Sequence, residues 1–68
     1  MEYKTANKFM LDLAKCMLDH GVTRHAVRQA FKQANLTMKL DPGISASDKR
    51  EVEVFKTALA TAYYELER

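Results

Sequence analysis

An all-α domain of three helices is the fold that this sequence of 68 residues predicts. Apolar residues recur at three- and four-residue intervals over three separate stretches, which is the pattern of helices with one buried face. Only two glycines and one proline interrupt the chain, and no repeat or low-complexity segment occurs. A chain of this length buries only about 60% of the surface that its unfolded form exposes, so we expect one small core and extra burial through a homodimer or a protein partner.

The first predicted helix covers residues 6–19, with the hydroxyl of Thr5 expected to cap it. Seven apolar residues form a wide stripe that we expect to be buried on one side: Phe9, Met10, Leu11, Leu13, Ala14, Met17 and Leu18.

A tight turn separates this helix from a second one over residues 24–34. Gly21 can take the left-handed conformation that ends a helix, Thr23 can cap the next one, and Asn35 is the expected left-handed terminator. Val27, Ala30, Phe31 and Ala34 share one face, and Arg24, Arg28 and Lys32 share another. One face should therefore pack against the core while the cationic face reaches outward.

Residues 35–45 are predicted to be a linker, and residues 46–67 a third helix. Residues 36–40 alternate apolar and polar side chains, but a single short strand without a partner is unstable, so we favour an extended segment that packs its apolar side chains. Asp41-Pro42-Gly43 signals a turn, and Ser45, with Asp48 three residues later, or Ser47 offers a cap. In the third helix, core packing is favoured over a dimer seam for the apolar residues at 3-4-3-4 spacing, which are Val52, Phe55, Leu59, Ala62 and Leu66.

The net charge of +2 is distributed unevenly along the chain. Residues 21–40 contain four basic and no acidic residues, whereas residues 41–68 contain six acidic and four basic residues. A local cationic stripe suits a surface that meets phosphates on one side only. No apolar run is long enough to span a membrane, no signal peptide is evident and the single Cys16 has no partner for a disulfide, so we expect a cytoplasmic protein that does not interact with membranes.

The segment from Lys15 to Lys32 resembles the helix-turn-helix of the phage repressor and Cro class. The match is best over residues 21–30, where Gly21, Val22 and Val27 stand at the positions that set the angle between the two helices in that family. Met17 and His20 depart from the family pattern, which favours a small and an apolar residue at these places. A bulky Met17 would push the helices apart and leave an antiparallel helical hairpin.

The resemblance implies a DNA-reading surface on the second helix. The base- and phosphate-contacting positions of the family fall on side chains that can all hydrogen-bond to DNA: Thr23, Arg24, His25, Arg28, Gln29 and Lys32. Arginine can address guanine and glutamine adenine in the major groove. The alternative is that the three cations form an ordinary solvated face.

The sequence contains only weak signals for a metal site or an active site. Cys16, Asp19, His20 and His25 lie close in sequence, but structural zinc sites usually have paired ligands on both sides of a turn, so packing is the better interpretation of Cys16. Three short helices offer little concavity for catalysis, and the sequence contains no phosphate loop or nucleophile elbow. We therefore expect no metal, no cofactor and no enzymatic activity.

The favoured function is a small DNA-binding transcriptional regulator, of the kind found among phage and plasmid accessory proteins, that acts as a homodimer on double-stranded DNA. The rival is a non-enzymatic adaptor or inhibitor that binds a protein partner through its helices. Tyrosines give large contact areas at such surfaces. The residues expected at a partner or dimer surface are Phe55, Leu59, Tyr63, Tyr64 and Leu66.

Overall fold

The chain forms three α-helices, as the sequence predicts: α1 (Tyr3–Asp19), α2 (Arg24–Thr37) and α3 (Ala46–Glu65). The structure is a computed structural model and describes residues 1–39 and 41–67. No strand occurs among these residues. The molecule is elongated, with extents of 40 × 21 × 20 Å.

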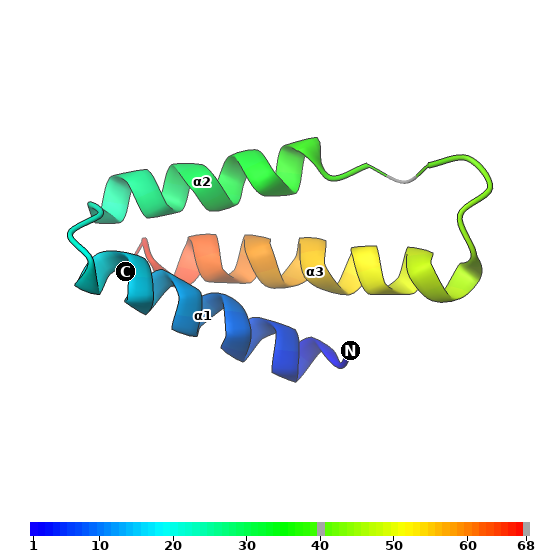
Figure 1. Ribbon diagram of the computed structural model, residues 1–68, viewed down its shortest axis with the longest axis horizontal. Coiled ribbons are helices and arrows are strands. Elements are labelled where there is room, and N and C mark those ends of the chain that lie inside the picture. The colour runs from blue at the N-terminus through cyan, green and yellow to red at the C-terminus, as the bar shows by residue number, and fades with distance from the viewer. Residues whose placement is uncertain (40, 68) are drawn as a thin grey trace.

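Helix α3 is the spine of the domain. Helix α1 runs in the same direction as α3, and α2 runs in the opposite direction (Figure 1). Helices α1 and α2 diverge from the turn that connects them, and both pack on α3. The contact between α1 and α2 is small by comparison. The first two helices thus form an antiparallel hairpin that is held together largely through α3.

The turn between α1 and α2 is specified by backbone geometry and by a cap. Gly21 has a φ of +92°, a region that residues with a Cβ rarely adopt. The amide of Gly21 donates to the carbonyl of Leu18 and the amide of Val22 to that of Met17, each at 3.0 Å, which is a Schellman motif. The Thr23 hydroxyl accepts from the amide of Ala26 at 3.1 Å, so the predicted cap of α2 is confirmed.

Two predicted boundaries are wrong. Helix α1 begins at Tyr3 and is preceded by Glu2, whose side chain makes no capping bond, so Thr5 lies inside the helix. Asn35 does not terminate α2, which continues to Thr37, because the Asn35 side chain bonds to α3 and its backbone stays helical. The linker is correspondingly shorter than expected.

Part of the segment expected to be extended is helical. Leu36 and Thr37 form the last turn of α2, and Met38 packs against the core; Leu40 lies outside the described residues. Ser45 caps α3 by accepting from the amide of Asp48 at 3.1 Å, as predicted. The turn at Asp41-Pro42-Gly43 is also confirmed, and α3 ends at Glu65 rather than at residue 67.

The core is built from side chains of all three helices and of Leu66, which directly follows α3. Four of its members are alanines, which let α1 and α3 approach closely. The buried residues are Ala6, Met10, Ala14, Val27, Phe31, Ala58, Leu59, Ala62 and Leu66. Partly buried side chains, including Phe55 and Tyr63, surround them. No helix in residues 1–39 or 41–67 combines the length and the apolar composition that crossing a membrane requires.

Candidate functional site: the groove between α2 and α3

The expected cationic stripe of α2 is divided between α3 and the solvent. The Arg24 guanidinium donates to the carbonyl of Leu66 at 3.1 Å. The Arg28 guanidinium lies 4.5 Å from the centroid of the Tyr63 ring and 3.7 Å from a carboxylate oxygen of Glu67. These two arginines therefore tie α2 to the C-terminal end of α3.

The remaining residues of the predicted DNA-reading set lie in three different environments. The Thr23 hydroxyl is used as a helix cap, Gln29 is half-buried, and His25 and Lys32 are exposed. The helix thus presents a weaker concentration of positive charge than its sequence suggests, because the charge of Arg28 is partly balanced within the fold.

The residues predicted for a partner surface differ in their exposure to solvent. Leu59 and Leu66 are buried in the core, and Phe55 and Tyr63 are half-buried. Tyr64 is 64% exposed, and its ring meets that of Tyr63 edge to face at a centroid distance of 5.5 Å. Burial of Leu59 and Leu66 confirms the core packing favoured for the third helix and corrects their placement in a partner surface. It follows from the central position of α3 between the other two helices.

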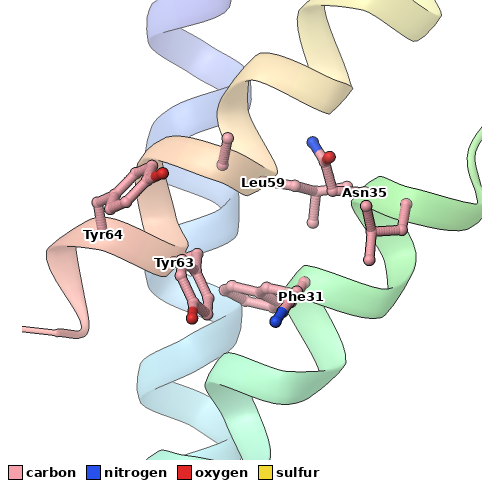
Figure 2. Close-up of a pocket in the computed structure, with 8 residues that line it drawn as sticks. Phe31, Asn35, Leu59, Tyr63 and Tyr64 are labelled. Atoms are coloured by element: carbon pink, nitrogen blue, oxygen red, sulfur yellow. The ribbon is translucent and has the colours of Figure 1, made fainter.

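A hollow of about 170 Å³ lies between α2 and α3, and we call it the α2–α3 groove. Helix α2 contributes Phe31, Lys32, Asn35 and Leu36, and helix α3 contributes Leu59, Ala60, Tyr63 and Tyr64. Phe31 and Tyr63 point toward one another from opposite helices, and Tyr64 lies on the α3 side (Figure 2). The buried Phe31 and Leu59 form its floor, whereas Leu36 and Tyr64 form exposed apolar rims.

Polar bonds hold the two walls of the groove at a fixed spacing. Toward the end of α2, the Asn35 side-chain amide donates to the carbonyl of Lys56 at 2.7 Å, and the Lys56 ammonium donates to the carbonyl of Met38 at 3.1 Å. At the other end, Arg24 and Arg28 make the contacts with α3 described above. The groove is therefore a preformed surface, supported at both ends.

Four of the groove residues are outside the site residues that the sequence predicts: Phe31, Asn35, Leu36 and Ala60. The sequence predicts Leu36 in a linker because Asn35 is the expected end of the helix, whereas α2 continues to Thr37. Leu36 follows Lys32 by four residues, and this spacing places the two side chains on the same face when the helix continues past Asn35.

The Cys16 and His20 pair does not extend to a metal site. The Cys16 sulfur lies 3.8 Å from Nδ1 of His20, and that nitrogen also lies 2.8 Å from the Cys16 carbonyl oxygen. Across the described parts of the chain, no cluster of three or more His, Cys, Asp or Glu side chains is arranged to hold a metal ion. Cys16 is exposed rather than packed in the core, contrary to the interpretation favoured from the sequence.

The chain was also compared with known proteins. Comparisons with protein families, curated proteins and solved structures find no match.

Proposed function

We propose that this protein is a non-enzymatic helical adaptor or inhibitor that binds a protein partner through the α2–α3 groove. The observation that carries the proposal is an apolar hollow with a buried floor and exposed rims, since Leu36 is 59% exposed and Tyr64 is 64% exposed. Exposed apolar groups around a concave, preformed surface are typical of sites that bind other proteins.

Site-specific crosslinking in the native cells tests this proposal. A photoreactive phenylalanine analogue is placed at Leu36 or at Tyr64, and at Lys15 on α1 as the control. We expect one partner protein to crosslink from positions 36 and 64 and not from position 15. Ala60→Trp, which fills the groove, should abolish the crosslinks while the circular dichroism spectrum stays helical. Equal crosslinking from all three positions, or none from the groove, contradicts the proposal.

DNA binding is a second candidate, supported by a different face of α2. Residues 20–39 include no acidic side chain, and His25 and Lys32 are exposed on a helix that follows a well-formed turn. These features suit contacts with phosphates, although Arg24 and Arg28 already contact α3.

An NMR titration with a random-sequence DNA duplex at low and moderate salt distinguishes the two candidates. Nonspecific phosphate binding weakens steeply as salt rises. Salt-sensitive shifts at His25, Gln29 and Lys32 would favour the DNA-binding function, and the absence of shifts at low salt would exclude it.

A further inference from the structure

The composition of the α2–α3 groove restricts what can occupy it. Its eight lining residues include six apolar or aromatic side chains, one amide, one cation and no acid. A hollow of about 170 Å³ accommodates one bulky apolar side chain, because roughly 150 Å³ suffices for a benzene-sized ring. The groove thus provides one main anchoring position with apolar margins.

Lys32 is the one charged side chain among the residues that line the groove. Lys32 is exposed, and no ion pair in the described residues engages it. The Arg28 guanidinium lies over the Tyr63 ring, where Glu67 balances part of its charge. On α3, Glu53 lines a separate surface hollow beside Tyr3. A carboxylate on the occupant would therefore find an available cation at Lys32.

The architecture indicates the conformation of the occupant. The described residues form no sheet, so no strand edge is available for pairing with an extended peptide. The α2–α3 groove, which lies between two antiparallel helices, instead suits an amphipathic helix, because the apolar side chains of such a helix lie on one face. The apolar floor also offers no hydrogen-bond donor to a phosphate, which disfavours a nucleic acid in the groove itself.

From these observations we propose that the α2–α3 groove binds an acidic amphipathic helix. One bulky apolar side chain of that helix lies on the floor formed by Phe31 and Leu59, and its neighbours contact Leu36 and Tyr64. A carboxylate about one turn away pairs with Lys32. This inference rests on the proposed function and names the chemistry of its partner.

Two matched synthetic peptides test the proposal by fluorescence anisotropy. Each has about 18 residues, long enough to form a helix on binding, with leucine and phenylalanine on one face. One carries glutamates beside that face, and the other carries lysines at the same positions. We expect the acidic peptide to bind more tightly, with an advantage that shrinks as salt rises.

Variants of exposed residues locate the binding surface without disturbing the core. Lys32→Gln should weaken the acidic peptide about 2- to 5-fold, as expected for an exposed ion pair, and Lys32→Glu should reverse the preference between the peptides. Tyr64→Ala should weaken both peptides about tenfold, as for an aromatic interface anchor. Lys15→Gln makes the same charge change on α1 and should have no effect.

Several outcomes would overturn the proposal. Equal affinity for the two peptides, or binding unchanged by Tyr64→Ala, excludes an acidic helix in the groove. Self-association that depends on Tyr64 would assign the groove to a second copy of the chain, and DNA-induced shifts at Leu36 and Tyr64 would assign it to nucleic acid. Cellular crosslinks from positions 36 and 64 without a preference for the acidic peptide would retain the proposed function and reject this partner chemistry. If neither the cellular crosslinks nor the preference for the acidic peptide is observed, the proposed function and this partner chemistry are both rejected.

Discussion

At the scale of single residues, contacts with a neighbouring helix decide what a charged side chain does. Arg28 stands in the middle of a cationic stripe, yet its guanidinium lies over the Tyr63 ring. Its side chain is only 20% exposed, whereas Lys32, one turn further along α2, is exposed to solvent. Two cations four residues apart thus have different roles, one in holding the fold and one at its surface.

Replacing Arg28 with alanine should therefore destabilise the domain. The cation–π contact with Tyr63 is partly shielded from water, so we expect a loss of about 1 kcal/mol in the free energy of unfolding. Urea denaturation followed by circular dichroism measures the change. Lys32→Ala is the matched control and should alter stability by less than about 0.5 kcal/mol. Equal effects of the two substitutions would contradict the structural role of Arg28.

At the scale of the elements, caps determine where two of the three helices begin. Helices α2 and α3 start after side chains that accept from the amide three residues later, Thr23 and Ser45 respectively. Helix α1 begins without such a bond, and the amino terminus of Met1 instead pairs with Glu51 of α3. Local hydrogen bonding thus specifies two helix starts, and the start of α1 is associated with a contact to α3.

A pair of threonine substitutions separates these cases. Thr23→Ala removes the cap of α2 and should cost about 1 kcal/mol of stability. Thr5→Ala lies within α1 and removes no cap, so its effect should stay within about 0.5 kcal/mol. Thermal unfolding of both variants gives the comparison. A larger loss of stability in Thr5→Ala than in Thr23→Ala would indicate that Thr5 caps α1, as expected from the sequence.

At the scale of the whole molecule, α3 carries the fold because small residues allow another helix to approach it. Ala58 and Ala62 of α3 and Ala6 of α1 are completely buried, and Ala14 is nearly so. A polar bond between the hydroxyls of Tyr3 and Thr61, 2.6 Å apart, also joins α1 to α3. Close packing of backbones thus compensates for the small number of large core side chains.

Enlarging one of these alanines should disturb the domain. Ala62→Leu has no space in the interface, and overpacking of this kind costs about 1–3 kcal/mol. Ala26→Leu introduces the same side chain at an exposed position of α2 and serves as the control. Calorimetric melting temperatures should fall for Ala62→Leu and change little for Ala26→Leu. No drop for Ala62→Leu would mean that α1 and α3 pack more loosely than the structure describes.

The candidate site was only partly predictable from the sequence. The contact area of tyrosines predicts a partner surface at Tyr63 and Tyr64, and the resemblance to a helix-turn-helix predicts a DNA contact at Lys32. These predictions place the three residues on two different surfaces, one for protein and one for DNA. The groove joins them because α2 and α3 lie side by side, a relation between residues some thirty positions apart that no local pattern contains.

The sequence by itself determined the number of helices, the turn at Gly21 and the caps at Thr23 and Ser45, because helical periodicity and capping depend on residues only a few positions apart. The tertiary structure decided where α2 ends, which arginines contact α3 and which apolar residues remain exposed. Helical spacing shows which side chains share a face, but only the packing of α3 against both other helices determines which of those faces is covered.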